Sequence, residues 1–179
     1  MWKNSETAYG LVTKAIHWLT VVMVFGLFAV GFWMVDLTYY SPWYKTAPHW
    51  HKSVGIILLI ITSLRLLWRW VNVSPLPISS HSNSVKKASK IAHLVIYVLL
   101  FLLMISGYLI STADDRAIDV FNWFSIPALG ELFDKQADIS GFIHQYVAYI
   151  LVALSILHGA AAVKHHVIDK DETLKRMIR

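Results

Sequence analysis

The sequence contains no cysteine among its 179 residues. This absence excludes disulfide bonds, iron–sulfur clusters, thiolate zinc sites and the Cys-x-x-Cys-His attachment of a c-type haem. Charged residues are also scarce, at 15% of the chain against 56% hydrophobic residues, and the mean hydropathy is +0.53. Such a composition excludes an ordinary soluble globular domain and predicts an integral membrane protein. The nine histidines are therefore the strongest transition-metal ligands in the chain.

Four long apolar runs, nearly free of carboxylates, follow one another along the chain. Each is about as long as the roughly 20 residues that a helix needs to cross the hydrocarbon core of a bilayer. A signal peptide is not predicted, because the N-terminal residues are polar and the first apolar run is too long for one. We predict an all-α, integral membrane four-helix bundle that forms a single domain over residues 1–179. Its expected spans are residues 15–35, 51–71, 91–112 and 139–166.

The basic residues lie mostly on one side of this predicted bundle. Twelve of the 16 Lys and Arg residues lie in the N-terminal arm, around the linker after the second span, or in the C-terminal tail. The opposite side has only Lys45, Lys52, Arg116 and Lys135. By the positive-inside rule, both termini face the cytoplasm of a bacterial-type inner membrane. The same asymmetry accounts for the net charge of +5, so we expect lipid contacts and no nucleic-acid binding.

The fourth span carries two histidines on nearly the same face. His144 and His158 are 14 residues apart, which in an α-helix means a rise of about 21 Å and an angular offset of about 40°. Ionisable groups inside a membrane helix are costly and usually functional. One helix therefore presents imidazoles at two depths, and each needs a partner.

The topology assigns a depth to the matching histidines of the other spans. His17 opens the first span at the cytoplasmic depth of His158, and His51 opens the second span at the periplasmic depth of His144. Pairs of imidazoles on facing helices are what bis-histidine ligation of haem iron requires. The pattern predicts two metal centres, formed by His17 with His158 and by His51 with His144.

Zinc binding, a proton relay and simple solvation are the rival interpretations of these histidines. Zinc would need a third or fourth ligand at one depth, and the spans offer almost no carboxylates. Gly31, Gly55 and Gly107 would leave room for a flat macrocycle, although glycine in a membrane helix more often serves close helix packing. We favour haem because two pairs match in depth and one helix supplies both depths.

Two further residues lie at the cytoplasmic depth. Arg65, 14 residues after His51, could pair with a haem propionate or a quinone oxygen, or extend to the membrane interface. His93 opens the third span, and we interpret it as a hydrogen-bond donor to a propionate or a quinone. An interface histidine and a third iron ligand are the alternatives for His93. Lys90 is another candidate for the quinone or propionate contact.

Four histidines are assigned to no metal centre. His49 competes with His51, but it is two residues away and so lies on a different face of the helix. His81 lies in the linker between the second and third spans, and His165 and His166 follow the last apolar run. We interpret His165 and His166 as solvated and assign no role to His81.

Together these residues resemble the bacterial di-haem cytochrome b561 family over essentially the whole chain. The motifs that carry the resemblance are His17-Trp18, His51 with Gly55 and Arg65, His93-Leu-Val-Ile-Tyr97, His144, His158, and His165-His166 followed by Lys170-Asp-x-Thr173-Leu174-x-Arg176-Met177. The resemblance implies two non-covalent b haems, one held by His17 and His158 on the cytoplasmic side and one by His51 and His144 on the periplasmic side. It also favours His51 over His49 and makes His93 a non-ligand.

The resemblance further implies electron exchange with ubiquinone. One branch of the family oxidises periplasmic superoxide and passes the electrons through both haems to the quinone on the cytoplasmic side. Here the predicted periplasmic regions carry seven acidic and four basic residues, a net charge of −3 that would repel an anion. We therefore expect an electron carrier with another periplasmic redox partner, such as an isoprenoid-binding protein. Superoxide oxidase is the alternative, and a haem-free membrane scaffold subunit is the alternative of another class.

Overall fold

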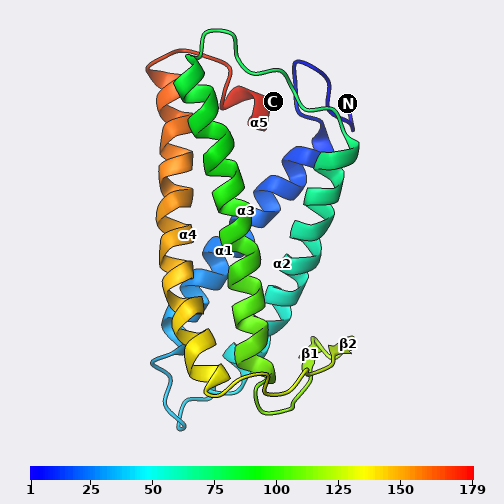
Figure 1. Cartoon of the computed structure of the whole chain (residues 1–179), viewed down its shortest axis with the longest axis vertical. Coiled ribbons are helices and arrows are strands. Elements are labelled where there is room, and N and C mark those ends of the chain that lie inside the picture. The colour runs from blue at the N-terminus through cyan, green and yellow to red at the C-terminus, as the bar shows by residue number, and fades with distance from the viewer.

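The computed structural model describes residues 1–179 as a bundle of four long helices with a small β-hairpin (Figure 1). The helices are α1 at Leu11–Met34, α2 at Thr46–Val71, α3 at Asn83–Thr112, α4 at Gln136–Val167 and a short α5 at Lys175–Ile178. The antiparallel strands are β1 at Ile118–Val120 and β2 at Phe124–Ile126. Both chain termini lie at one end of the bundle and the hairpin at the other (Figure 1). We call these the termini end and the hairpin end.

All four long helices have the length and composition of membrane spans. At 1.5 Å per residue, even the 24 residues of α1 exceed a hydrocarbon core of about 30 Å. Large apolar side chains such as Val22, Leu94 and Leu157 are about two-thirds exposed on the outside of the bundle. Lipid contacts suit such a surface, which water would not. The four apolar helices expected from the sequence are confirmed.

The helices begin earlier than the predicted spans. α2 contains Pro48, which the first turn of a helix tolerates because its missing N–H would have no intrahelical partner. α3 begins at Asn83 because Ser82 caps it, its hydroxyl accepting a hydrogen bond from the Val85 amide at 3.3 Å. The apolar pattern marks only the part of each helix inside the bilayer, so these polar first turns lay outside the predicted spans.

The bundle consists of two helix pairs. α1 packs mainly against α2, and α3 packs mainly against α4, whereas contacts between the pairs are sparse. One apolar layer at mid-height joins all four helices, formed by Val24, Leu58, Leu100, Met104 and Leu151. This layer separates the two ends of the bundle interior.

The β-hairpin is fixed onto the first turns of α2. The buried Ser53 hydroxyl donates to the Asp119 carbonyl at 3.2 Å and accepts from the Phe121 amide at 3.1 Å. Ile56 packs against both Ile118 and Val120 of the hairpin. The predicted all-α fold has no strands here, because strands of three residues leave too short a period-2 pattern to detect.

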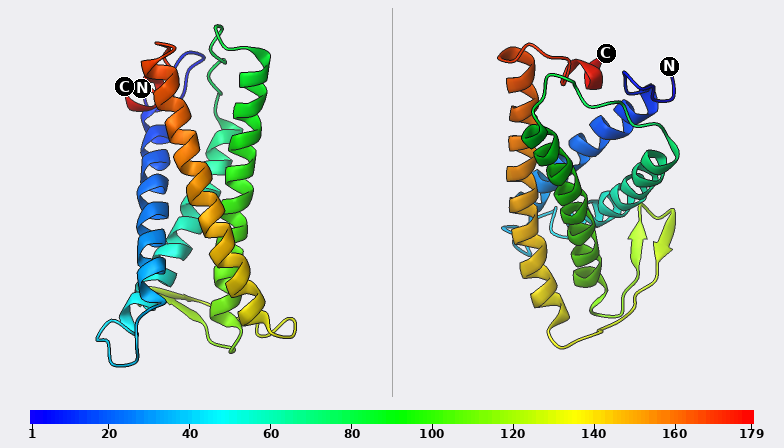
Figure 2. Two further views of the ribbon diagram at one scale, coloured as in Figure 1. Left: turned by 90° about the vertical axis from the view of Figure 1, so that its left-hand side faces the viewer. Right: turned by 45° about the horizontal axis from the view of Figure 1, so that its top comes forward.

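At the termini end, the N-terminal arm, the linker between α2 and α3, and the C-terminal tail lie side by side (Figure 2). The indole of Trp18 donates to the Met177 carbonyl at 2.9 Å, and the Arg176 guanidinium donates to the Leu76 carbonyl at 2.7 Å. The tail therefore folds back over the bundle, close to the start of α1.

Candidate functional site

Each long helix places a residue of the apolar layer midway between two predicted site positions. On each helix the three residues are spaced seven apart. Seven residues are about two helical turns, so the three lie close to one face of the helix. The sets are His17–Val24–Gly31, His51–Leu58–Arg65, His93–Leu100–Gly107 and His144–Leu151–His158. Because neighbouring helices in the chain run in opposite directions, these residues form two levels. The termini level contains His17, Arg65, His93 and His158, and the hairpin level contains Gly31, His51, Gly107 and His144.

At the hairpin level, His51 of α2 faces His144 of α4. Their ring centroids are 6.2 Å apart. Two imidazole nitrogens at about 2 Å on opposite sides of one metal ion would separate the ring centroids by about 6 Å. The spacing of this pair fits a single ion between the rings.

The hydrogen bonds of the two rings also fit ligation. The Nδ1 of His144 donates to the Leu103 carbonyl at 2.9 Å, with the Ser106 hydroxyl 3.3 Å away. This contact keeps the proton on Nδ1 and leaves the Nε2 lone pair free, as in histidines that bind metals. The Nδ1 of His51 is buried without any hydrogen-bond partner. No group of the protein therefore satisfies the hydrogen-bonding capacity of Nδ1 in this ring.

Two glycines make room for these imidazoles. A Cβ at Gly31 would lie 3.1 Å from Cε1 of His51, and a Cβ at Gly107 would lie 3.0 Å from Cε1 of His144. Both contacts are tighter than ordinary van der Waals packing. We predicted that these glycines leave room for a macrocycle, and we did not predict their contact with the imidazoles. Gly31 and Gly107 lie 14 residues after His17 and His93, and this spacing was a usable signal. Gly55 has open space around its Cβ position.

The termini level is more crowded. The rings of His93 and His158 lie 5.2 Å apart. The guanidinium of Arg65 lies 2.8 Å from Nδ1 of His17 and 5.5 Å from the centre of the Tyr97 ring. The structure therefore places Arg65 against His17 and His93 against His158. It does not select His17 over His93 as the partner of His158, so that pairing stays a prediction.

The contact between Arg65 and His17 has a consequence for ligation. A guanidinium can only donate, so Nδ1 of His17 accepts and the proton of the neutral ring lies on Nε2. Ligation through Nε2 therefore requires Arg65 to release His17. An anionic group such as a carboxylate would draw Arg65 away, since it offers the guanidinium a stronger, charge-assisted partner.

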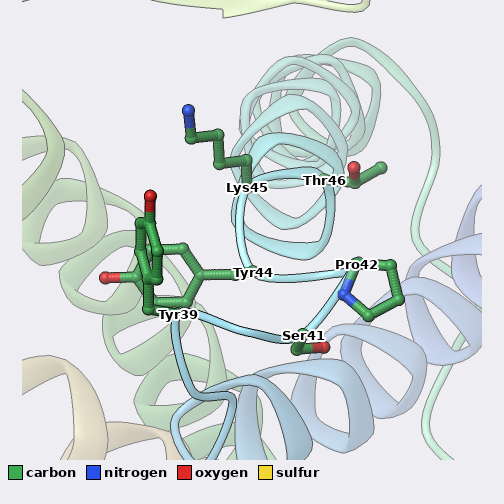
Figure 3. Close-up of a pocket in the computed structure, with 6 residues that line it drawn as sticks. All are labelled: Tyr39, Ser41, Pro42, Tyr44, Lys45 and Thr46. Carbon is green, nitrogen blue, oxygen red and sulfur yellow. The ribbon is translucent and has the colours of Figure 1, made fainter.

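A separate pocket of about 400 Å³ opens in the connection between α1 and α2, at the hairpin end (Figure 3). It is lined by Tyr39, Ser41, Pro42, Tyr44, Lys45 and Thr46. No predicted ligand lies in it, and its lining has neither imidazole nor carboxylate. The pocket is therefore not a metal centre.

Residues 8–179 match the prokaryotic cytochrome b561 family. The chain belongs to this family. Membership implies a haem b cofactor, and with four apolar helices the cytochrome is a multi-pass membrane protein, as the sequence predicted.

Curated relatives agree with this assignment. The chain is 48% identical to cytochrome b561 homolog 2 of Escherichia coli K12, over 98% of this chain and 93% of the relative. It is 28% identical to "Probable superoxide oxidase CybB" of Yersinia pestis, over 95% of both chains. It is 24% identical to cytochrome b561 homolog 1 of E. coli K12, over 91% of this chain and 92% of the relative. The superoxide oxidase is thus the more distant of the first two relatives.

Proposed function

We propose that this cytochrome is a di-haem electron carrier of the bacterial inner membrane, which exchanges electrons between a periplasmic partner and ubiquinone. His51 and His144 would hold one haem b, and His17 and His158 the other. When bound, haem b supplies reversible one-electron transfer at its iron. The observation that carries the proposal is the 6.2 Å spacing of His51 and His144, which fits one ion between two imidazoles.

The protein's own residues would keep oxygen away from this chemistry. With two imidazoles holding each haem, the haem would supply electron transfer rather than oxygen binding. Leu103 and Ser106 orient His144 through its Nδ1. The apolar layer at Leu58 and Leu151 excludes water between the two levels, which on α4 are separated by about 21 Å.

The distribution of charge supports an orientation with both termini in the cytoplasm. Twelve of the 16 basic residues lie at the termini end, which the positive-inside rule assigns to the cytoplasm. The hairpin level would then lie on the periplasmic side, and the termini level on the cytoplasmic side.

Arg65 and His93 would bind the polar groups at the cytoplasmic level. Arg65 and Arg69 both lie within 6 Å of the Tyr97 ring centre, so two positive charges converge beside His93 and His17. A propionate or a quinone oxygen would be held there by charge-assisted hydrogen bonds. His93 and Lys90 would act as further donors.

Superoxide oxidase is the second candidate, and it is supported by the 28% identity to a relative of that name. The electrostatics favour another partner. Among the few basic residues at the hairpin end, Arg116 is already paired with Asp114 at 3.2 Å, and the predicted periplasmic regions have a net charge of −3. An anion would gain little steering from such a surface. A periplasmic redox or isoprenoid-binding protein is the partner that we favour.

Haem content tests the proposal. Protein purified without a histidine tag is expected to show a b-type reduced spectrum with two haems per chain, and its reduced haems are expected to be reoxidised by a ubiquinone analogue. A colourless chain would support the scaffold alternative instead. Mixing the oxidised protein with superoxide in a stopped-flow instrument separates the other two candidates, because only the oxidase should be reduced near the diffusion limit.

A further inference from the structure

Three metal-binding side chains from distant parts of the sequence meet at the termini end, outside the two histidine levels. His81 lies in the linker between α2 and α3, His165 in the last turn of α4, and Asp171 in the tail. Their ligand atoms all lie within 4.8 Å of one another. The side chains of both histidines are only 17% exposed, and that of Asp171 is 8% exposed. The prediction that His165 is solvated was therefore wrong.

The two imidazoles approach the same carboxylate oxygen. Nε2 of His81 lies 2.6 Å and Nδ1 of His165 lies 3.7 Å from Oδ2 of Asp171. The two rings are tilted by 35°, with centroids 4.6 Å apart. Neighbouring ligands around a tetrahedral zinc ion, each at about 2 Å, lie about 3.3 Å apart. This value falls between the two observed distances, so small side-chain movements would create the site.

The surroundings hold Asp171 in place. The Thr173 amide donates to Oδ1 of Asp171 at 2.8 Å, which leaves Oδ2 toward the histidines. Partial burial raises the pKa of Asp171, but hydrogen bonds from Thr173 and His81 outweigh this effect and lower the pKa to about 2. The carboxylate is therefore ionised at neutral pH. Asp169 also contacts His165, at 2.6 Å, but Lys164 donates to both of its oxygens.

We propose that His81, His165 and Asp171 bind one divalent transition-metal ion, with zinc as the best match. Two imidazole nitrogens and one carboxylate oxygen are a common zinc ligand set, with water completing the tetrahedron. Binding requires the ring nitrogen that now contacts a carboxylate to give up its proton, to the other nitrogen of a neutral imidazole or to solvent from a charged one. The ion would fasten the linker and the tail to the end of α4, and so hold the tail over the start of α1.

Metal analysis of the haem-loaded protein tests this site. Tag-free protein is dialysed against buffered micromolar Zn²⁺, and zinc and iron are counted by mass spectrometry. We expect one zinc per chain in addition to the haem iron, with X-ray absorption showing imidazole nitrogens at about 2 Å. His81→Ala and His165→Ala should each weaken zinc binding more than about tenfold. His166→Ala is the matched control, since Nδ1 of His166 reaches the backbone carbonyl of Asp171, at 3.5 Å, and not its carboxylate, and this variant should bind zinc as the parent does.

Asp171→Asn separates metal binding from tail docking. The amide oxygen can still accept a hydrogen bond from His81, so the tail should stay docked and the haem content unchanged, while zinc affinity falls more than about tenfold. Haem-loaded protein that takes up no zinc, or that loses zinc equally in the His166→Ala control, would overturn the site. Neither result would bear on the haem ligands.

Discussion

The two levels of the bundle are built on the same four helices, but they are prepared for a ligand in different ways. At the hairpin level, two imidazoles face each other at 6.2 Å and a glycine accommodates each ring. At the termini level, the rings of His93 and His158 are 5.2 Å apart and Arg65 contacts His17. The spacing at the first level fits one ion between two rings, whereas the second level also carries a guanidinium that would attract an anion.

The cause of this difference lies in two pairs of equivalent positions. Where α1 and α3 carry Gly31 and Gly107 at the hairpin level, they carry His17 and His93 at the termini level. A glycine has no ligand atom and leaves space, so the hairpin level offers only one pair of imidazoles. A histidine adds a ligand atom, so the termini level offers several possible pairs.

Removing a ligand of the hairpin level should remove one haem outright. We expect His144→Ala to reduce the haem content from two per chain to one. Its partner His51 is the other imidazole of the hairpin level, so that level has no spare histidine to replace His144. Pyridine haemochrome analysis of the purified protein measures this loss. His49→Ala is the control, and it should keep both haems because its ring packs against Phe121 instead. Two haems retained in His144→Ala would refute the ligand pair.

The termini level should respond less simply, because it has a spare histidine. We expect His17→Ala to lose the second haem and His93→Ala to keep it, with quinone reduction slowed about tenfold by the loss of a hydrogen bond to a charged or polar partner. Haem content and the rate of reoxidation by a ubiquinone analogue measure the two effects. If His93→Ala lost the haem and His17→Ala kept it, the ligand of α1 would be misassigned.

Much of this arrangement could be predicted from the sequence, and the reason is physical. A bilayer permits only helices with satisfied backbones in its core, so apolar length locates the spans, and charge asymmetry orients them. The spacing from His144 to His158 then fixes two depths. The choice between His17 and His93 could not be derived from depth alone, because it depends on how the helices are rotated about their axes. The resemblance to the family supplied that choice.

Other features of the structure could not be predicted, because they leave too weak a pattern in the sequence. The contact between Gly107 and His144 joins different helices, and no local periodicity reports it. The β-hairpin is held by Ser53, whose two hydrogen bonds cross more than 60 residues of sequence. His81 and Asp171 meet through loops whose course hydropathy does not constrain.

A methyl group added beside the His144 ring should perturb the hairpin level without removing a ligand. In Gly107→Ala the new Cβ would lie 3.0 Å from Cε1 of His144, so the ring or the helix must shift. Overpacking of this kind costs about 1–3 kcal/mol, and we expect a lower thermal unfolding temperature and altered low-spin haem signals in electron paramagnetic resonance. Gly141→Ala on α4 is the control, because its Cβ would meet nothing within 4 Å. Identical haem signals in both variants would contradict the proposed role of Gly107.

The smallest effect is expected from Ser53, which acts on the hairpin level from outside it. Ser53 lies two residues after His51 and holds the β-hairpin through the Asp119 carbonyl and the Phe121 amide. Ser53→Ala should leave both haems bound, but it removes the partner of the partly buried Phe121 amide, which costs about 1 kcal/mol. Hydrogen exchange should therefore accelerate at Phe121 and across β1, while the termini level is unchanged. The hairpin covers only the first turns of α2, so exchange at His93 should not change. Faster exchange at His93 would mean that the two levels are not independent. The contrast between them would then depend on the whole bundle and not on local contacts.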